Sequence, residues 1–374
     1  MKILFVLEYF HPYIGGVEHL FWELSKALAT QGHQVKVITT RFDKKLPQKE
    51  CKDGIDIYRV NCDNRFSFFI KSVPSIFKNS KDFDVVHTTT YTAAPPAWLV
   101  SRLRNKKSVL TFHEYWGDLW KQVPYLNRRQ RILYSAFERM VSYLPFSKIV
   151  AVSKFTQQSL IKAGVNQSKI RVIYNGLDYN FIEQINAKIA ISDVKTTKKR
   201  ATLNYLFVGR LGVSKGLDLL LEASAIFLQK NPEATLKLVI PKLPKKMYAL
   251  ILNKINSLPC MHQITVMHHL TKEELYKQIK QASFIVIPSY SEGFCFVAAE
   301  ACALNVPIIS SDRGALKEVV SGQYIPMNSL TTKGLLEALQ NAKQQKWHYK
   351  DSVRFSLDKS VEQYVHLYKE MIDG

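Results

Sequence analysis

Short apolar runs alternate with amphipathic stretches from the first residues of the chain onward. Residues 2–7 are mostly β-branched or aromatic, which is typical of a buried strand. Residues 17–32 carry apolar side chains at helical spacing and end at Gly32, a residue type that commonly terminates helices. Residues 35–39 form a second apolar run. Because a glycine-containing loop separates the first strand from the helix, this order predicts a Rossmann-type unit.

The same alternation appears in both halves of the chain, on either side of a polar, charged segment at residues 185–201. We therefore predict an α/β fold with two facing Rossmann-like domains and a cleft between them. The predicted domains are residues 1–180 and 202–354, joined by a linker at 181–201. The remaining predicted strands are residues 55–60, 83–88, 107–112, 148–153, 169–174, 204–209, 235–240, 264–267, 284–287 and 306–310.

Residues 284–303, which read FIVIPSYSEGFCFVAAEACA, join a predicted strand to an alanine-rich helix at residues 294–304. Gly293 stands at the junction, next to Glu292. Free backbone N–H groups and the helix macrodipole stabilise an anion at such a helix N-terminus. This junction is therefore a candidate phosphate site.

Two glutamates flank that junction. Glu300 follows Glu292 after seven intervening residues, which places it roughly 10 Å along the helix. A nucleotide-sugar has a matching layout, with a hexose on one side of a diphosphate and a ribose on the other, and carboxylates accept hydrogen bonds from sugar hydroxyls. The alternative is an ordinary helix, with one acid that complements the dipole and one that is solvated.

A pair of cations follows the predicted strand 204–209. Arg210 and Lys215 stand between this strand and an amphipathic helix at 217–227. Two fixed cations suit a nucleoside diphosphate leaving group, which gains negative charge as its bond to the sugar breaks. Either cation alone is more often a surface charge. The order of strand, Arg, Lys and helix, followed by the glutamate pair, makes the pattern specific.

Two candidates lie in the first half. His113 follows the predicted strand 107–112, and ligands of parallel α/β sheets bind at the carboxyl ends of strands. Gly15 and Gly16 lie in the loop after the first strand. They do not complete the G-x-G-x-x-G fingerprint, so a tight turn explains them equally well and a nicotinamide-dependent dehydrogenase is the least favoured enzyme class.

Composition limits the partners and the compartment. The 374-residue chain has a formal charge of +21, which favours nucleic acid, anionic lipid or phosphorylated substrates. No helix-turn-helix, zinc-finger or RNP-like run is present, so no nucleic-acid partner is expected. The five cysteines show neither metal-like spacing nor an even disulfide set, and we expect neither a signal peptide nor a membrane-spanning run. We expect a cytoplasmic protein with reduced cysteines and no bound metal.

Residues 115–146 mix aromatic and basic side chains. This composition fits an interfacial helix at an anionic membrane surface, or alternatively a core helix with a solvated basic side. The aromatic and aliphatic members are Tyr115, Trp116, Trp120, Tyr125, Leu126, Ile132, Leu133, Tyr134, Phe137, Tyr143 and Phe146. The basic members are Lys121, Arg128, Arg129, Arg131 and Arg139.

The E-G-F-x5-E-A stretch at 292–301 resembles the signature of the retaining glycosyltransferases of family 4, which have the GT-B fold of two facing Rossmann-like domains. G-R-L-x-x-x-K-G at 209–216 resembles the same family's diphosphate motif, and N-G-L-D at 175–178 its N-G-V-D tract. The resemblance covers nearly the whole chain and is strongest at 1–40, 205–220 and 284–320.

The resemblance implies a hexosyltransferase that transfers a sugar, with retention, from a nucleotide-diphosphate-sugar to a hydroxyl of a lipid-linked or cell-envelope glycan precursor. The first domain would take the acceptor and the second the donor, and the C-terminal helix at about 355–374 would pack back on the first domain. No metal cofactor would be needed. Peripheral attachment to the inner face of the membrane would suit such an acceptor.

The resemblance also implies roles for individual residues. The implied catalytic residues are His113, Glu292, Arg210 and Lys215. The implied donor-binding residues are Gly15, Gly16, Arg210, Lys215, Glu292, Gly293, Phe294, Cys295, Phe296 and Glu300. In these roles Arg210 and Lys215 hold the diphosphate, Glu292 the sugar hydroxyls and Glu300 the ribose.

This sequence departs from the family pattern in two loops. Residues 241–246 (PKLPKK) replace a usual glycine-rich turn, and Gly314-Ala315 replaces a usual pair of glycines. Two other functions stay open at this point. One is a nucleotide-sugar epimerase on the same fold, and the other is a non-enzymatic basic module that binds lipid or polysaccharide.

Overall fold

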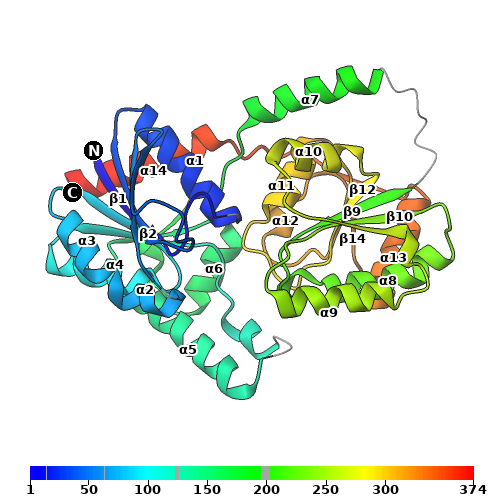
Figure 1. Cartoon of the computed structure of the whole chain (residues 1–374), viewed down its shortest axis with the longest axis horizontal. Helices are drawn as coiled ribbons and strands as arrows, with labels where there is room; N and C mark the ends of the chain where they lie inside the picture. The colour runs from blue at the N-terminus through cyan, green and yellow to red at the C-terminus, as the bar shows by residue number, and fades with distance from the viewer. Residues whose placement is uncertain (14, 63, 123–125, 195–202) are drawn as a thin grey trace. The chain divides into compact units, whose positions relative to one another are not determined.

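The computed structural model describes residues 1–13, 15–62, 64–122, 126–194 and 203–374. Contacts divide these residues into two compact units (Figure 1). Unit 1 comprises Met1–Gly176 with Phe355–Gly374, and unit 2 comprises Leu177–Arg354. Each unit contains one sheet with helices on both faces.

Unit 1 is built on an eight-stranded sheet in its described residues, in the order β3-β4-β2-β1-β5-β6-β7-β8. All neighbouring strands run parallel except β3 and β4. The strands are β1 (Lys2–Val6), β2 (Gln34–Thr40), β3 (Lys49–Lys52), β4 (Ile55–Val60), β5 (Val85–Thr89), β6 (Lys107–Phe112), β7 (Lys148–Ala151) and β8 (Ile170–Val172).

Two helical layers cover this sheet. Helices α1 (Gly16–Thr30) and α14 (Leu357–Asp373) pack together on one face. On the other face Leu4 and Val6 of β1 pack in one cluster with Phe68 and Ile76, and a second cluster continues this layer. That layer contains α2 (Arg65–Lys71), α3 (Val73–Asn79), α4 (Ala94–Leu103), α5 (Arg128–Tyr143) and α6 (Lys154–Lys162), and the unit also has short 3₁₀ turns η1 (Gly117–Gln122) and η2 (Gln167–Lys169).

Unit 2 repeats the architecture with a seven-stranded sheet in its described residues, ordered β11-β10-β9-β12-β13-β14-β15. Only the pair β14–β15 is antiparallel. The strands are β9 (Asn204–Val208), β10 (Thr235–Val239), β11 (Ile264–Met267), β12 (Phe284–Ile287), β13 (Ile308–Ser310), β14 (Gly322–Pro326) and β15 (His348–Lys350).

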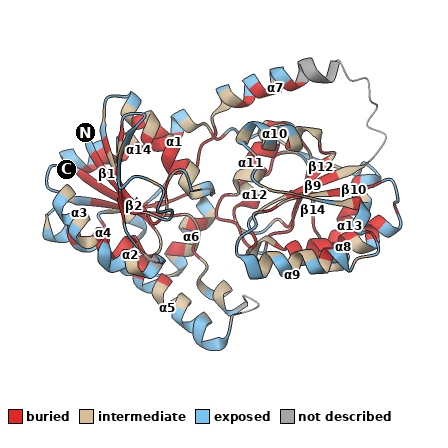
Figure 2. Cartoon of the chain, in the orientation of Figure 1, coloured by how far each residue is buried: buried red, intermediate tan, exposed pale blue. Residues whose placement is uncertain are grey.

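The helices of unit 2 again form two groups. The largest apolar cluster joins the sheet to α8 (Leu217–Gln229), α9 (Lys245–Asn256) and α13 (Thr332–Lys343). The second group contains α7 (Tyr179–Val194), α10 (Lys272–Gln281), α11 (Phe296–Ala303) and α12 (Leu316–Val319), with 3₁₀ turns η3 (Val213–Lys215) and η4 (Met261–Gln263) elsewhere. Figure 2 shows the burial that this layering produces, with the central strands of both sheets buried and the outer helical faces exposed.

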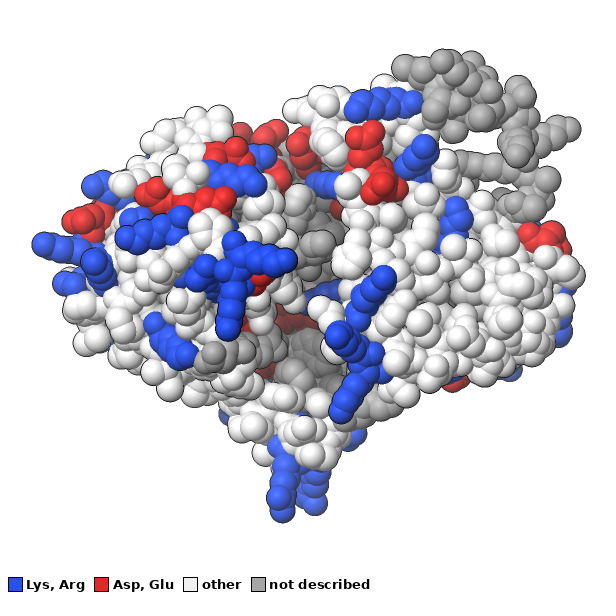
Figure 3. Space-filling model, viewed as in Figure 1, with Lys and Arg blue, Asp and Glu red and all other residues white. Residues whose placement is uncertain are grey.

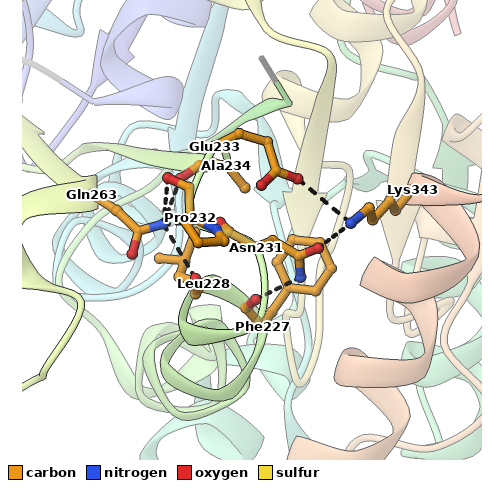
Figure 4. Close-up of polar contacts among 8 residues, drawn as sticks. All are labelled: Phe227, Leu228, Asn231, Pro232, Glu233, Ala234, Gln263 and Lys343. Atoms are coloured by element: carbon orange, nitrogen blue, oxygen red, sulfur yellow. Dashed lines mark hydrogen bonds and ion pairs between the residues drawn. The ribbon is translucent and has the colours of Figure 1, made fainter. Parts of the chain in front are cut away.

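A buried polar network fixes the turn between α8 and β10 in unit 2 (Figure 4). The Gln263 amide donates to the carbonyls of Asn231 (3.0 Å) and Ala234 (2.9 Å), and Asn231 donates to Phe227 O at 2.7 Å. Lys343 of α13 contacts the Asn231 side chain and lies 3.5 Å from Glu233. Because buried carbonyls need donors, these side chains replace the hydrogen bonds that a regular element would supply.

The predicted α/β class is confirmed, and each of the twelve predicted strands is present, whereas β3, β14 and β15 were not predicted. Three local predictions differ. Residues 66–77, expected as one aromatic helix or loop, form α2 and α3, which are separated at Ser72. Helix α7 occupies most of the segment expected to be a linker or solvated loop, and residues 195–201 of that segment lie outside the described residues. Residues 115–146, expected as one helical stretch, are helical in α5 only from Arg128 onward. Trp116 lies in a loop, and Trp120 lies in η1.

Candidate active site

The junction of β12 and α11 has the predicted strand–loop–helix form. Cys295 precedes the helix with a φ of +75°, in the left-handed region that costs an ordinary side chain free energy. Within the described residues, no side chain caps the N-terminus of α11. Gly293, Phe294, Cys295 and Phe296 therefore form a turn whose helix end remains available to an anion.

Lys215 and Glu292 form the central contact of this site. The Lys215 ammonium lies 2.7 Å and 2.8 Å from the two carboxylate oxygens of Glu292. Ser289 also donates to Glu292, at 2.7 Å. Glu292 is 6% exposed, so a paired cation and a hydroxyl donor offset the loss of hydration of its charge.

Glycine allows the two loops that carry this ion pair to approach closely. Gly216 follows Lys215 with a φ of +66°, and a Cβ there would lie 2.1 Å from Pro288 O. Ser214 O accepts a hydrogen bond from Tyr290 N at 2.7 Å. The glycine of the K-G pair in the sequence motif is thus required for steric reasons, because a side chain at 216 would push the two loops apart.

A second glycine supports Glu292 from the loop after β13. Gly314 has a φ of +63°, and a Cβ there would lie 2.3 Å from Glu292 O. Ala315, at the second position of the expected glycine pair, is fully buried and donates its N–H to Glu292 O at 2.8 Å. Only the first position of the pair therefore needs glycine in this chain.

Glu300 lies in the second turn of α11 and is 7% exposed. Burial raises its pKa to about 7, while the charge of Lys272 and a hydrogen bond from Tyr276 act in the opposite direction. The Tyr276 hydroxyl lies 3.3 Å from Glu300 Oε1. Burial also raises the pKa of the neighbouring Cys295 thiol, which keeps that thiol protonated.

Arg210 lies in the loop between β9 and η3 and is exposed. Among the described residues it makes no hydrogen bond or ion pair. The structure thus brings Lys215 and Glu292 together in unit 2 and places Arg210 in the loop that leads to Lys215.

His113, Gly15 and Gly16 belong to unit 1. His113 follows β6, and its ring packs edge-on against Phe21 of α1 with centroids 5.9 Å apart. Gly16 opens α1, and Gly15 is extended with a φ of −176°. A tight turn therefore does not explain Gly15, because any residue can adopt this conformation.

A buried polar group lies next to His113. His87 of β5 contacts Tyr368 Oη of α14 at 2.6 Å and Thr111 Oγ1 of β6 at 2.7 Å. Burial, with a smaller contribution from the charge of His113, lowers the pKa of His87 to about 3. His87 is therefore a neutral structural residue that ties α14 to the sheet beneath His113.

Sequence reasoning missed Ser289, Tyr276 and Lys272. Ser289 stands three residues before Glu292, so proximity in the sequence could have indicated it. Tyr276 and Lys272 lie on α10, and only the packing of α10 against α11 reveals that they face Glu300. Among the described residues, no group of three or more His, Cys, Asp or Glu side chains is arranged as a metal site.

Comparison with known proteins decides the family. The family description "Glycosyltransferase Family 4" matches residues 14–181, and "Glycosyl transferases group 1" matches residues 190–343. The chain belongs to the family 4, group 1 glycosyltransferases. The expected hexosyltransferase class is thereby confirmed over the epimerase and the non-enzymatic module. Enzymes of this family use nucleotide-sugar donors.

Two curated relatives of this glycosyltransferase match along most of their length. An uncharacterized glycosyltransferase of Methanocaldococcus jannaschii is 26% identical over 337 residues, which covers 86% of this chain and 83% of the relative. The GDP-mannose:cellobiosyl-diphosphopolyprenol alpha-mannosyltransferase of Xanthomonas campestris is 27% identical over 324 residues, which covers 83% and 78%.

Two solved structures show the same fold. Sucrose-phosphate synthase of Thermosynechococcus elongatus superimposes with a TM-score of 0.80 at 19% identity, over 100% of this chain and 99% of the other. HepE of Anabaena, solved with UDP and glucose, superimposes with a TM-score of 0.73 at 17% identity, over 99% of this chain and 100% of the other. The predicted GT-B fold is confirmed.

Proposed function

We propose that this glycosyltransferase binds a nucleotide-diphosphate-hexose in unit 2 and transfers the hexose with retention to a hydroxyl of a lipid-linked glycan precursor. The observation that carries the proposal is the bidentate contact of Lys215 with Glu292 at the N-terminus of α11. It unites a cation suited to a phosphate, a carboxylate suited to sugar hydroxyls and a helix end suited to an anion.

In the proposed reaction Arg210, Lys215 and the N–H groups at residues 294–296 hold the diphosphate. The bond between the anomeric carbon and the diphosphate oxygen breaks, and the charge that develops on this oxygen is stabilised by the two cations. The acceptor hydroxyl forms the new bond on the same face of the sugar, and its proton passes to the leaving oxygen. Glu292 positions the sugar hydroxyls, and Glu300 accepts hydrogen bonds from the ribose.

Unit 1 is assigned to the acceptor. His113 stands at the carboxyl end of β6, where ligands of parallel sheets bind. The cations of unit 2 take the charge-stabilising role that a metal has in other transferases. We therefore expect addition of EDTA to leave transfer activity unchanged.

A lipid-linked acceptor is supported by the relatives. The name of the Xanthomonas enzyme specifies cellobiosyl-diphosphopolyprenol, and a human relative is named as part of a phosphatidylinositol N-acetylglucosaminyltransferase. The human relative is 22% identical over 354 residues, which covers 91% of this chain and 68% of that protein. We propose an acceptor of the same kind, presented at the cytoplasmic face of a membrane.

Helix α5 offers a surface for such a membrane. Ile132 (60% exposed), Met140 (44%) and Tyr143 (51%) recur along one face of α5, with Leu133 (64%) beside them. Arg128, Arg129 and Arg139 are exposed on the same helix, and Figure 3 shows basic side chains gathered over its end. Exposed apolar groups among arginines suit an anionic interface.

Of the described aromatic side chains that the sequence suggested, Tyr143 is exposed and the others are buried or half-buried. Tyr115 and Phe146 are buried, and Trp120 packs against Trp116 and Tyr134. Tyr125 lies outside the described residues. Apart from Tyr143, the described aromatic residues thus fit the core alternative, whereas Tyr143 and the aliphatic and basic residues of α5 fit the membrane alternative.

Neighbouring helices extend this surface. Phe66 and Ile70 of α2 are 65% and 72% exposed, and Leu103 of α4 is 64% exposed. Residues 65–81 and 94–107 contain several Lys and Arg but no Asp or Glu. Helix α4 packs against α2 and shares an apolar cluster with α5, so these side chains belong to one layer. No described helix is both long and apolar enough to span a bilayer, and we propose peripheral attachment.

A thermal-shift panel with UDP, GDP and ADP and their sugars tests the donor site. A ligand that binds only the folded state raises the melting temperature. We expect a rise with at least one nucleoside diphosphate, lost in Arg210→Ala and kept in Lys242→Ala, which changes an exposed lysine outside the site. The donor proposal fails if no nucleotide shifts the wild type, or if Arg210→Ala responds like the wild type.

Sedimentation with vesicles tests the membrane surface separately. We expect phosphatidylglycerol-containing vesicles, but not pure phosphatidylcholine vesicles, to bind the chain at low salt. The double substitution Ile132→Ser and Leu133→Ser should weaken binding, whereas Leu250→Ser, at a 67% exposed position of α9, should not. The proposed membrane surface is rejected if both variants lose vesicle binding equally, or if the wild type does not bind the vesicles.

A further inference from the structure

Glu300 has an unusual environment for a buried acid. Among the described residues its carboxylate accepts one hydrogen bond, from Tyr276 Oη at 3.3 Å, which is long for a hydroxyl donor. Tyr276 itself is fully buried. A carboxylate has about four acceptor positions, so most of the capacity of Glu300 is not used by the protein.

Helix α10 supplies both groups that favour the charged form of this carboxylate. Lys272 lies one turn before Tyr276, and its ammonium is 5.7 Å from the centroid of the Tyr276 ring. The same ammonium is 5.6 Å from the ring of Phe181 on α7, which in turn contacts Tyr276 with centroids 5.9 Å apart. Tyr276 is thus fixed by α7 on one side while its hydroxyl reaches α11.

Ionisation of Glu300 is balanced between opposing influences. Burial raises its pKa to about 7, and Lys272 and Tyr276 limit this rise. The other titratable groups around this cluster are Cys295, whose pKa is raised by burial, and Asp178 and Tyr179, which face Tyr276. The carboxylate therefore changes its charge within the physiological pH range.

We propose that Tyr276 and Lys272 are positioning residues that hold the Glu300 carboxylate ionised and aimed at the ribose of the donor, and so make the site selective for ribonucleotides over deoxyribonucleotides. A charged carboxylate accepts hydrogen bonds from the ribose hydroxyls, whereas a protonated one has less capacity. This inference rests on the proposed function, in which Glu300 receives the ribose.

The ratio of two affinities isolates this effect. Isothermal titration would measure the dissociation constants of UDP and 2′-deoxy-UDP, or of GDP and 2′-deoxy-GDP, between pH 5.5 and 9. Titration of the diphosphate is common to both members of a pair, so it cancels in the ratio. For the wild type we expect preference for the ribonucleotide to rise through a midpoint near pH 7, because the ionised Glu300 is the better acceptor.

Tyr276→Phe should move the midpoint upward by about one pH unit, because the charged form loses a hydrogen-bond donor. At pH 7 the preference should fall about fivefold, and raising the pH should restore it. Lys272→Met should shift the midpoint in the same direction. Lys277→Met on α10 and Tyr349→Phe on β15 are exposed controls that should leave the midpoint unchanged.

Restoration by pH separates a positioning role from a merely structural one. If Tyr276 only supports the packing of α10, Tyr276→Phe will weaken both nucleotides equally at every pH, and the inference is overturned. An unshifted midpoint in both Tyr276→Phe and Lys272→Met also overturns it.

Glu300→Gln distinguishes this failure from failure of the proposed function. We expect this variant to lose the pH dependence of the ratio. If it does and the Tyr276 and Lys272 variants resemble the wild type, the ribose role stands and the inference falls. If Glu300→Gln keeps the full pH dependence, or if the wild type binds no nucleotide, both the assignment of Glu300 and the inference are wrong.

Discussion

Glu138 in unit 1 and Glu300 in unit 2 are both glutamates removed from water, with 0% and 7% of their surface exposed. Their hydrogen-bond partners differ sharply. Glu138 accepts from Tyr91 Oη, Trp116 N, Gly117 N and Trp120 Nε1 at 2.8–3.0 Å. From the described part of the chain, Glu300 accepts one long hydrogen bond, from Tyr276. A saturated acid holds the fold together, whereas an acid with free acceptor capacity can receive a ligand.

The partners of Glu138 explain its structural role. They lie in the segment that follows His113, in η1 and after β5, so the carboxylate ties these segments to α5. Burial raises the pKa of Glu138, and the four donors act against that rise. Sequence reasoning included Glu138 only within an amphipathic stretch, because nothing in its spacing indicates four donors from three segments.

The largest expected effect is on stability, from Glu138→Ala. The substitution leaves two backbone N–H groups, a phenol and an indole without their acceptor, and we expect the free energy of unfolding to fall by about 4 kcal/mol. Urea unfolding measures it. Glu183→Ala, which breaks an ion pair between side chains more than 60% exposed, should change it by less than about 1 kcal/mol. Similar losses in the two variants would contradict the structural role of Glu138.

The next effect is the pH dependence of stability in Glu300→Gln. The pKa of Glu300 is about 7 in the folded chain, above the ordinary value of 4.5, so the folded state binds the proton more tightly than the unfolded state. Its contribution to stability is present below pH 4.5 and is lost as the pH rises through 7. Between pH 4.5 and pH 8, the free energy of unfolding of the variant should rise by about 3 kcal/mol relative to that of the wild type.

Unfolding of wild type and variant at several pH values measures that difference, in which the other titrating groups cancel. The same comparison for Glu138→Gln has a different expected result. There the amide nitrogen would face at least one N–H donor in either orientation, so the variant should be less stable than the wild type at pH 8. A stabilising Glu138→Gln or a destabilising Glu300→Gln at pH 8 would reverse the contrast between the two acids.

A third effect concerns binding. Glu300→Gln should weaken the nucleoside diphosphate that the wild type binds by about tenfold at pH 8, because the ribose loses a charged acceptor. Trp120→Phe, which alters a partner of Glu138, should leave that affinity within about twofold. Isothermal titration of the full chain gives both values. A larger loss of affinity in Trp120→Phe than in Glu300→Gln would contradict the assignment of the nucleotide to unit 2.

The smallest effect is that of Trp120→Phe on stability. It removes one of four donors to Glu138 and keeps most of the ring, so we expect a loss of about 1 kcal/mol in urea unfolding. A loss as large as that of Glu138→Ala would mean that the indole, and not the carboxylate, holds η1 in place.

The sequence predicted the parts of this molecule that depend on local pattern. All the described strands except β3, β14 and β15, together with α11, follow from apolar runs and spacing, and the motif glycines Gly216 and Gly314 have positive φ angles that glycine favours. The family followed from motifs at 209–216 and 292–301. Helix α7 was missed because a polar, charged composition is shared by linkers and solvated helices.

Contacts between elements far apart in the sequence could not be predicted. The pairing of Lys215 with Glu292, 77 positions later, depends on how the loop after β9 meets the loop after β12. The approach of Tyr276 to Glu300 depends on the packing of α10 on α11. The roles of Arg210, His113, Gly15 and Gly16 remain predictions, because motif membership suggests these roles and does not establish the contacts.

Titration of UDP, GDP and ADP into wild type, Lys215→Ala and Glu292→Gln tests the central claim most directly. Both oxygens of Glu292 contact the Lys215 ammonium, so a diphosphate would compete with this carboxylate for the lysine. The neutral Glu292→Gln variant should therefore bind the nucleoside diphosphate about threefold more tightly, while Lys215→Ala should bind it about tenfold more weakly. An unchanged affinity in Lys215→Ala, or an equal loss in both variants, would contradict the proposal that this lysine receives the diphosphate.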